Sequence, residues 1–556
     1  MTIQNPLALA AATVLIAQSC LHGANVLEDV RTVAIRGAAA PSRGTDAYVF
    51  SSYLSLPVIN NAGQVAFSGD LYRIDSLTGT RRAVLTEGGG DGLRLAALAK
   101  EQAPGDAAGV AFSTFYETSL SDAGQTTFTG LLRNFESFEG FGVGIWTEQQ
   151  GELRPVVRTG DVLPSIERRF ESEDVSISGS FGPQVNGLGQ VAVKSTLASG
   201  GTVILSEAGG NGLSAVVRDG DPAPGTKEEA RFFRVGGAYS NDGASLVVEA
   251  QLDETASFDQ GIWSDTGGGM RLVARQGDQP PQTEPGESYR RLMGATINNR
   301  GQTAFLAWVT KVDAEPYIDY AIFRELEPGD LHLLARSGSA ALPLDADVNF
   351  GELEQPLLND RGQAVFKGAL VGTGVDETNG SGIWRDSVED GLSLVVRTGD
   401  QAPDLDEGVA FHLLADPLLN ERGHIAFVAS LRGPNIDHTN DYAIFAEDPI
   451  GDLRLVAREG DVIDVSSDPH TPDIRTLRTL GRAGGREGEL TNDIVGTLGA
   501  FNDLGQLAFL TTFTDGAPGI FVSNRVAVPE PATLVLLASC LAPVAYCVRL
   551  ARTATL

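Results

Sequence analysis

The sequence predicts an all-β fold: a β-propeller-like ring of about eight four-stranded antiparallel blades, closed by an N-terminal strand and followed by a C-terminal transmembrane helix. Three observations predict this fold. A hairpin motif recurs along most of the chain, two strand patterns follow the copies, and the last copy lacks a final strand that the N-terminus can supply. A repeat of this length is typical of one supersecondary unit stacked many times.

The recurring motif is Asn-x-x-Gly-Gln-x-Ala-Phe, as in Asn60 to Phe67. Asn or Ser opens a tight turn because its side chain can bond the backbone two residues on, and Gly takes the positive φ that closes the turn. The strand after the turn is apolar on both faces, so we expect each sheet to be covered on both sides. The copies begin at Asn60, Ser121, Asn186, Ser240, Asn298, Asn359, Asn420 and Asn502.

Two further strand patterns complete each unit. One is Gly-Ile-Trp or a variant, such as Gly382 to Trp384, and the other is Leu-x-x-Val-x-Arg-x-Gly-Asp, as in Leu392 to Asp400. With the extended segment before each Asn, they give four short strands per unit, which is typical of a propeller blade. The arginine of the last pattern recurs as Arg158, Arg218, Arg275, Arg336, Arg397 and Arg458.

These arginines allow two interpretations. They could form a ring of charges that holds an anionic ligand, or each could stabilise its own blade by bonding loop carbonyls and carboxylates through its planar donor fork. Because the arginine recurs so regularly and a site normally breaks symmetry, the structural role is favoured.

The ends of the repeat region predict how the ring closes. The eighth unit contains the Asn502 turn and Gly519-Ile520-Phe521, but no Arg-x-Gly-Asp strand follows it. A matching strand, Val30 to Gly37, precedes the first turn. We therefore expect the N-terminal strand to complete the last blade, whereas an open solenoid would need capping repeats.

Composition and the N-terminus indicate an exported protein. The chain has 72 acidic and 41 basic residues, which disfavours nucleic acid and anionic lipid as partners. Residues 1–24 contain an apolar core of the length of a signal peptide. The cysteines are Cys20, Cys540 and Cys547, so the predicted ring, residues 25–526, has no disulfide framework.

Residues 527–556 form a three-part tail. Pro529-Glu530-Pro531 is followed by an apolar stretch, Ala532 to Val548, and then by Arg549 and Arg552. The stretch is at the short limit for a membrane span, and basic residues after it predict a cytoplasmic end. This order resembles the PEP-CTERM sorting signal that exosortases process, although two spaced arginines replace the usual tight basic cluster.

Together, the repeats and the tail resemble the bacterial NxxGxxAF tandem-repeat surface proteins over residues 30 to 556. The resemblance implies an exported, envelope-associated protein of exopolysaccharide-producing, Gram-negative-type bacteria, transiently anchored in the inner membrane and processed by an exosortase. It supplies no catalytic residues.

Carboxylates recur in the loop between the second and third strands of each unit. We expect these loops to emerge together and propose weak Ca²⁺ binding through them, with acidic polysaccharide bound through the ion. A plain solvated loop is the simpler alternative. The candidate metal ligands are Asp253, Asp259, Asp313, Asp319, Asp437 and Asp441, and the candidate sugar-stacking residues are Tyr317, Tyr320 and Tyr442.

Two functions compete on these patterns. Symmetric repeats without a unique polar cluster favour a non-enzymatic scaffold that binds matrix polysaccharide or another envelope component, with no cofactor except weakly bound Ca²⁺. The alternative is a secreted carbohydrate-active enzyme, a lyase or glycosidase, and a pocket with non-repeated carboxylates, Tyr and Arg would favour it.

Overall fold

The computed structural model describes most of the chain between residues 26 and 527. The gaps are residues 75–78, 91, 135–140, 163–173, 177–182, 198–199, 209, 211, 227–229, 242–244, 254–258, 267–268, 312–318, 467–469 and 481–499. The predicted signal peptide and the predicted sorting tail with its transmembrane helix lie outside the described residues.

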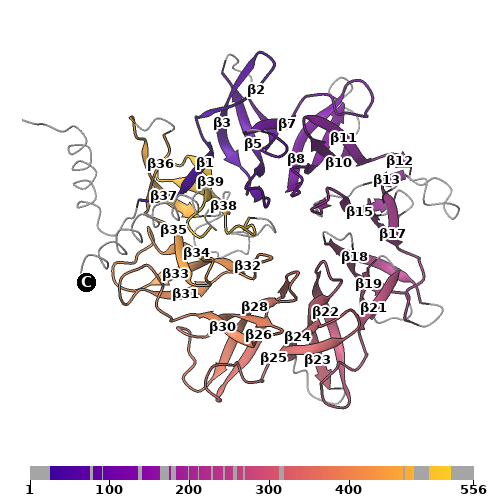
Figure 1. Ribbon diagram of the computed structural model, residues 1–556. Helices are drawn as coiled ribbons and strands as arrows, with labels where there is room; N and C mark the ends of the chain where they lie inside the picture. Colours follow the sequence, from indigo (N-terminus) through magenta and orange to yellow (C-terminus); the bar gives the residue numbers. More distant parts are fainter. Residues whose placement is uncertain are drawn as a thin grey trace, which may run out of the picture.

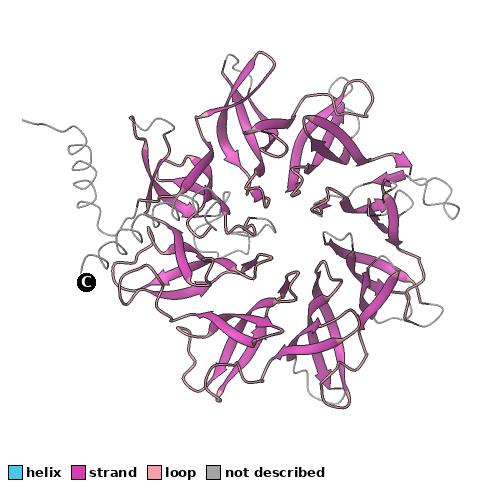
Figure 2. Cartoon of the chain, in the orientation of Figure 1, coloured by secondary structure: helices cyan, strands magenta, loops and turns pink. Residues whose placement is uncertain are grey.

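The described residues form an eight-bladed β-propeller. Eight antiparallel sheets follow one another around a central opening (Figure 1). In blades 1 to 7 the four main strands pair in chain order, and the described residues contain strands, turns and loops but no helix (Figure 2). The predicted ring of about eight four-stranded blades is therefore confirmed.

The strands of blades 1 to 4 have the following bounds. Blade 1 contains β2 (Ala39–Arg43), β3 (Asp46–Leu54), β4 (Val58–Ile59), β5 (Val65–Arg73), β6 (Thr80–Thr86) and β7 (Arg94–Leu98); blade 2 contains β8 (Val110–Leu120), β9 (Thr126–Asn134), β10 (Phe141–Gln149) and β11 (Glu152–Arg158); blade 3 contains β12 (Asp161–Val162), β13 (Asp174–Ser176), β14 (Gln184–Val185), β15 (Val191–Leu197), β16 (Thr202–Ser206) and β17 (Ser214–Arg218); blade 4 contains β18 (Phe232–Ser240), β19 (Leu246–Leu252), β20 (Asp259–Asp265) and β21 (Met270–Arg275).

The second half of the ring repeats the plan. Blade 5 contains β22 (Glu287–Ile297), β23 (Thr303–Lys311), β24 (Asp319–Glu325) and β25 (Leu331–Arg336); blade 6 contains β26 (Val348–Leu353), β27 (Leu357–Leu358), β28 (Ala364–Gly372), β29 (Ser381–Ser387) and β30 (Gly391–Arg397); blade 7 contains β31 (Ala410–Leu414), β32 (Leu418–Leu419), β33 (Ile425–Arg432), β34 (Tyr442–Glu447) and β35 (Leu453–Arg458); blade 8 contains β36 (Val462–Asp464), β37 (Ile474–Leu480), β38 (Leu507–Phe513), β39 (Pro518–Ser523) and β1 (Val30–Ile35).

The N-terminal strand closes the ring. β1 pairs antiparallel with β39, placing Thr32 opposite Phe521 and Ile35 opposite Gly519. The sheet order β1-β39-β38-β37 gives β1 the fourth-strand place in blade 8. In Figure 1 this indigo strand lies among the yellow strands from the other end of the chain. The predicted closure is confirmed.

The hydrophobic core is divided among the blade interfaces. Eight clusters of buried side chains each combine residues from two neighbouring blades. Between blades 5 and 6, for example, Leu306 and Ile322 pack with Phe366 and Trp384. Both faces of a blade are buried in this way, as the sequence predicted. Burial of each large side chain contributes about 1.5–3 kcal/mol, so every blade interface contributes to stability, the one between blades 7 and 8 with the largest cluster and the one between blades 2 and 3 with the smallest.

A steric pairing explains the Gly-Ile-Trp pattern. Trp384 lies over Gly382 on the same face of β29, and a Cβ at Gly382 would stand 2.8 Å from the indole ring. The indole N–H donates to the Leu342 carbonyl at 3.0 Å. Phe replaces Trp in blades 5, 7 and 8. Blades 5 and 7 have Ala321 and Ala443 at the glycine's place, whereas blade 8 keeps Gly519, where a Cβ would lie 2.6 Å from the Phe521 ring.

The register of the fourth copy corrects the sequence prediction. Asn241 N donates to the Ser245 carbonyl at 3.1 Å, as Asn60 N donates to the Gln64 carbonyl at 3.0 Å. The fourth turn therefore begins at Asn241 and not at Ser240. The prediction was wrong by one residue because Gly243 is the third residue counted from Asn241, whereas the glycine is the fourth residue of the other turns.

Among the described residues, no helix is long and apolar enough to cross a membrane.

Candidate functional site

The eight motif turns form an inner ring around the central opening (Figure 1). Each turn links the first and second strands of its blade, and the side chain of its opening Asn is buried. The Asn Nδ2 donates to the backbone carbonyl of the opening residue in the next blade. Among the described residues these bonds join Asn60 to Ser121, Asn241 to Asn298, Asn298 to Asn359, Asn359 to Asn420, Asn420 to Asn502, and Asn502 to Asn60, at 2.5–3.2 Å.

The same Asn side chain also shapes its own turn. Asn60 Oδ1 accepts from Ala62 N at 3.1 Å and from Gln64 N at 2.9 Å. Asn60 Nδ2 also donates to Gln64 Oε1 at 3.0 Å. The amide therefore uses its oxygen for the local turn and its nitrogen for the neighbouring blade, a combination that Ser and Asp cannot provide.

The Gly and Gln of the motif fit the same interface. Gly63 has φ +73°, and a Cβ built on it would lie 2.5 Å from Oε1 of Gln506 in the preceding blade. A Cβ built on Gly189 would likewise lie 2.6 Å from Oε1 of Gln125. A glycine is thus required both for the turn conformation and for the close approach of the neighbouring blade.

A second set of bonds runs beside the Asn bonds, through the residue after each Asn. Asn61 N donates to Asp122 Oδ1 at 2.8 Å, and Glu421 N donates to Asp503 Oδ1 at 2.8 Å. Asp503 N in turn donates to Asn61 Oδ1 at 2.9 Å, across the closure of the ring. The Asp122 and Asp503 carboxylates therefore accept hydrogen bonds from backbone N–H groups of the preceding turn.

Blade 2 interrupts the Asn bonds because Ser121 has no amide. Its hydroxyl still shapes the local turn by accepting from Gln125 N at 3.0 Å. The contact to blade 3 is made instead by Gln125, whose Nε2 donates to the Gly189 carbonyl at 2.6 Å. The link between blades is kept, but it comes from another side chain.

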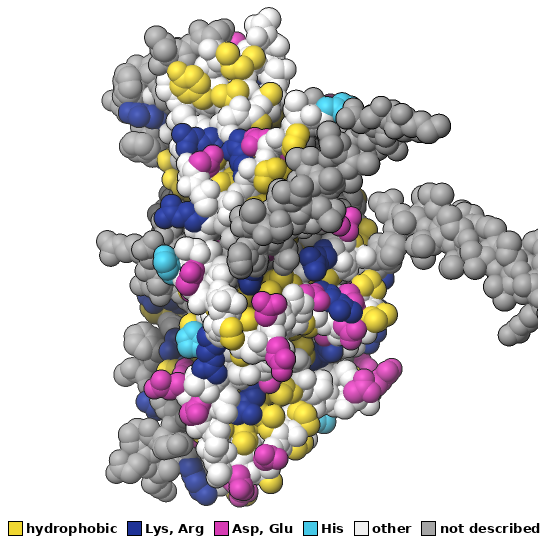
Figure 3. All heavy atoms as spheres, turned by 90° about the vertical axis from the view of Figure 1, so that its left-hand side faces the viewer, with side chains coloured by type: hydrophobic (Ala, Val, Ile, Leu, Met, Phe, Trp, Pro, Cys, Tyr) yellow, Lys and Arg dark blue, Asp and Glu magenta, His cyan; other side chains and the backbone are white. Residues whose placement is uncertain are grey.

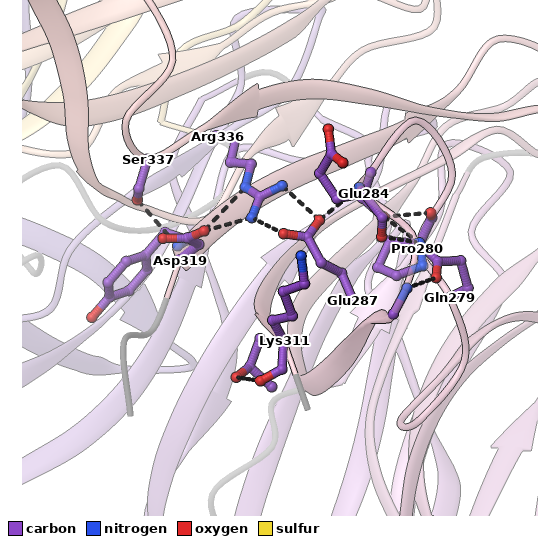
Figure 4. Close-up of polar contacts among 12 residues, drawn as sticks. Gln279, Pro280, Glu284, Glu287, Lys311, Asp319, Arg336 and Ser337 are labelled. Carbon is purple, nitrogen blue, oxygen red and sulfur yellow. Dashed lines mark hydrogen bonds and ion pairs between the residues drawn. The ribbon is translucent and has the colours of Figure 1, made fainter. Parts of the chain in front are cut away.

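The fourth-strand arginines bond either within their blades or to the carboxylate three residues further along the chain, a structural role as the favoured interpretation predicted. Arg336 binds Asp319 at 2.5 Å and Glu287 at 2.7 Å, all within blade 5 (Figure 4). Arg275 binds Asp259 at 2.5 Å, and Arg158 binds Asp161 at 2.9 Å. The Arg336 guanidinium holds the pKa of the Glu287 carboxyl below its usual range. These arginines stabilise the outer ends of the blades.

The candidate metal ligands are largely engaged in the blades' own hydrogen bonds. Asp259 and Asp319 pair with arginines, and Asp253 Oδ1 accepts from Arg231 N at 3.2 Å. Asp437 Oδ1 accepts from the backbone and hydroxyl of Thr439, which lower the pKa of the carboxyl. Asp441 differs, since burial raises its pKa. Asp313 lies outside the described residues.

The described residues contain no cluster of three His, Cys, Asp or Glu side chains arranged to hold a metal ion. Calcium binding through the outer loops stays a prediction. The candidate sugar-stacking tyrosines are also partly engaged: Tyr320 packs edge-on against Trp308 at 6.1 Å between ring centroids, and Tyr442 packs against the core between blades 7 and 8. Tyr317 lies outside the described residues.

One polar cluster between blades 6 and 7 breaks the symmetry and was missed in the sequence. Lys367 Nζ binds Glu354 Oε1 at 2.8 Å and Asp416 Oδ1 at 2.9 Å. Burial and the adjacent Asp416 carboxyl raise the pKa of Glu354 to about 7, against the opposing effect of Lys367. A carboxylic acid that keeps its proton near neutral pH can act as a general acid. The place of Lys367 is apolar in blades 5, 7 and 8, at Leu306, Val428 and Leu510, but it is charged in blades 3 and 4, at Lys194 and Glu249. A charge at this place of the repeat is the signal that could have identified the cluster.

The side of the outer wall seen in Figure 3 carries charges of both signs. On the face in Figure 3, acidic and basic side chains are interspersed with exposed apolar ones. Ion pairs between partly exposed groups include Arg454 with Asp448 at 3.0 Å.

Comparison with known proteins places the chain in a family. A family model matches residues 17–344 and 256–535, which together span nearly the whole ring. The chain belongs to the family of unknown function DUF7453. No curated protein matches the DUF7453 chain in sequence.

Several solved structures of very different sequence are similar to this DUF7453 protein, and two of those below are named as propellers. They include the β-propeller domain of the Trilobed protease from Pyrococcus furiosus (10% identity, 74% of this chain and 96% of that chain, TM-score 0.34) and the polysaccharide lyase Uly1 (11%, 77% and 90%, 0.32). The Dos1 propeller is similar at 7% identity, over 88% of this chain and 99% of that chain, with TM-score 0.36. The propeller fold is therefore assigned from the strand pairing of this chain, and these similarities indicate no activity for it.

Proposed function

We propose that this DUF7453 protein is an exported scaffold of the cell envelope or extracellular matrix that binds polysaccharide and is not an enzyme. The observation that carries the proposal is the structural use of the repeated polar residues. The Asn residues bond blade to blade, and the fourth-strand arginines bond within blades. Such a ring is a preorganised surface, and preorganisation reduces the entropy that binding costs.

Export and sorting rest on the sequence. We propose that residues 1–24 direct export and that an exosortase-type enzyme recognises Pro529-Glu530-Pro531, with Arg549 and Arg552 on the cytoplasmic side of a transient membrane anchor. Glu530→Ala should then leave the protein uncleaved in the inner-membrane fraction, whereas Glu389→Ala, on an exposed turn, should not. Normal processing of the Glu530→Ala protein would contradict this part of the proposal.

The alternative, a carbohydrate-active enzyme, is favoured by one observation. The Glu354, Lys367 and Asp416 cluster holds two adjacent carboxyl groups, whose side chains are 40% and 38% exposed. Glu354 keeps its proton near neutral pH and can act as a general acid. It hydrogen-bonds Asp416 directly, however, whereas the carboxyl pairs of glycosidases stand about 5 Å or more apart. None of the three residues belongs to the repeated motif positions, so an active site of this alternative would be located at this cluster.

A panel of acidic and neutral polysaccharides separates the two functions. We expect the purified full-length protein to bind at least one polymer reversibly, with no new reducing ends or unsaturated products after prolonged incubation. Product formation that Glu354→Gln abolishes would establish the enzyme instead. No binding to any acidic or neutral polymer would refute the scaffold function in its polysaccharide-binding form.

A further inference from the structure

The apex of each inner turn, the third residue of the motif, differs around the ring. It is alanine or leucine on one side, at Ala62, Ala123, Leu188 and Leu504, and arginine in three consecutive blades, at Arg300, Arg361 and Arg422. We call these three residues the arginine arc. Since the turns surround the central opening (Figure 1), the arc lies at its edge on the side of blades 5, 6 and 7.

The fold does not require arginine at this place. In six of the turns the apex residue donates its backbone N–H to the opening Asn: Ala62 N donates to Asn60 Oδ1 at 3.1 Å, and Arg300 N donates to Asn298 Oδ1 at 3.0 Å, with the same bond at Leu188, Arg361, Arg422 and Leu504. Alanine and leucine perform this role equally well. The arginine side chains are therefore additional to the turn, and all three residues are exposed.

The arc keeps its donors available. In the part of the chain that the structure describes, the Arg300 and Arg422 guanidinium groups have no ion pair, and Arg361 Nη1 donates to the Arg422 carbonyl at 3.0 Å. This last contact shows that neighbouring members of the arc lie side by side.

The carboxylates beside the arc are engaged elsewhere. Asp360 accepts from Asn299 N at 2.6 Å, and Glu421 accepts from Asp360 N at 2.5 Å. Behind the arc, Arg385 is paired with Glu447 at 2.8 Å. The negative groups are thus turned toward backbone amides, while the guanidinium forks of the arc remain open to a ligand.

The protein as a whole carries a formal net charge of −31, which repels polyanions. An acidic polymer therefore needs a local cationic site to bind at all. Arginine is suited to this because its planar fork binds a carboxylate through two parallel hydrogen bonds. Three guanidinium groups on successive blades suit a polymer that carries a carboxylate on each of many sugar units. Once one carboxylate is bound, the next ones bind the same polymer molecule, which increases the overall affinity.

We propose that the arginine arc binds a carboxylated polysaccharide of the polyuronate type at the edge of the central opening, with Ala62, Ala123, Leu188 and Leu504 providing the apolar side against which sugar rings pack. The proposal rests on the scaffold function and names its ligand class and its site. It differs from the calcium hypothesis because the carboxylate is bound directly by arginine.

The test compares two variants that lose the same charge. Arg300→Ala, Arg361→Ala and Arg422→Ala are combined in one full-length protein, because alanine already stands at this apex in blades 1 and 2. The control combines Arg36→Ala, Lys100→Gly and Lys311→Ala, three exposed residues away from the inner turns. Glycine is the natural choice at Lys100, where φ is +69° and where blade 2 has Gly160.

Binding of polygalacturonate and of neutral dextran is measured by calorimetry at low and moderate salt. We expect wild type and control to bind polygalacturonate within about 2-fold of each other, and the arc variant to bind at least about 10-fold more weakly, with a reduced salt dependence. Equal binding by the arc variant and the control would overturn the proposal while leaving the scaffold function intact. So would equal losses for polygalacturonate and dextran. If wild type binds only other polymers, the arc assignment fails, and if it binds none, the scaffold function fails with it.

Discussion

The inner turns and the outer loops of this propeller repeat with the same period but use their polar residues differently. In the inner ring, Asn502 reaches across to blade 1, and its partner Asn60 lies 442 residues away in the sequence. In the outer loop of blade 7, Asp437 binds Thr439, and Asn440 binds the Asn435 carbonyl. The inner turns thus bond from blade to blade, whereas Asp437 and Asn440 shape their own outer loop. Arg432 of the same blade also donates to the Thr378 carbonyl in the outer loop of blade 6, at 3.1 Å. Changes at the inner ring should therefore affect the whole molecule.

The largest effect should follow from opening the ring. Deleting residues 26–37 removes β1, exposes the edge of β39 and uncovers buried apolar side chains from the interface of blades 8 and 1. We expect a lower melting temperature and aggregation through the free edge, because an unpaired strand offers its N–H and C=O groups to other chains. Differential scanning calorimetry and light scattering check this. A deletion protein that melts like wild type and stays monomeric would contradict closure by β1.

The second prediction concerns Glu459, which is buried at the outer end of blade 7, where blade 6 has Thr398. Burial, with the Asp441 carboxylate acting in the same direction, raises the pKa of Glu459 to about 8. In the unfolded chain a Glu titrates near 4.3. The folded state therefore binds the proton more tightly, and the stability that this group contributes below about pH 4.3 is lost as the pH rises through about 8.

Glu459→Thr should accordingly stabilise the protein at pH 9, by roughly 2–4 kcal/mol, with a much smaller difference at pH 5. Urea unfolding at the two pH values measures this difference. Glu377→Thr, on an exposed outer loop, provides the control and should show no such dependence. An equal change for Glu459→Thr at both pH values would mean that the carboxyl group is not the cause.

The smallest expected effect concerns single substitutions that compare an inner turn with an outer loop. Asn502→Ala removes the amide that bonds blade 8 to blade 1 and leaves the buried Asn60 carbonyl without this donor, at an expected cost of about 1–3 kcal/mol. Asp437→Ala, in the outer loop, should leave the melting temperature close to that of wild type, because its bonds are local and exposed. Thermal unfolding of the two variants side by side tests this ranking. If they melt alike, inner and outer polar groups do not differ as the structure indicates.

Several features of the fold could be predicted from the sequence because they depend on local physics. The turn motif fixed seven of eight turns, since Asn and Gly act within a few residues of one another. Apolar residues on both faces of the strand at Val65 to Phe67 required cover on both sides. The missing fourth strand after Phe521 and its match at Val30 to Gly37 predicted how the ends meet.

Other features were decided only by the tertiary structure, because they join residues that no local pattern connects. The sequence explained Asn60 as a turn former, but the direction of its Nδ2 depends on where the next blade stands. The fourth turn begins at Asn241, as its hydrogen bonds show, although Gly243 suggested an earlier start. The carboxylates of the outer loops looked free in sequence, yet Asp259 and Asp319 pair with arginines that follow them by about one strand. The sequence determined the blades and their number, whereas the twist and stacking of the blades determined which polar groups are used inside the ring and which remain at its centre for a ligand.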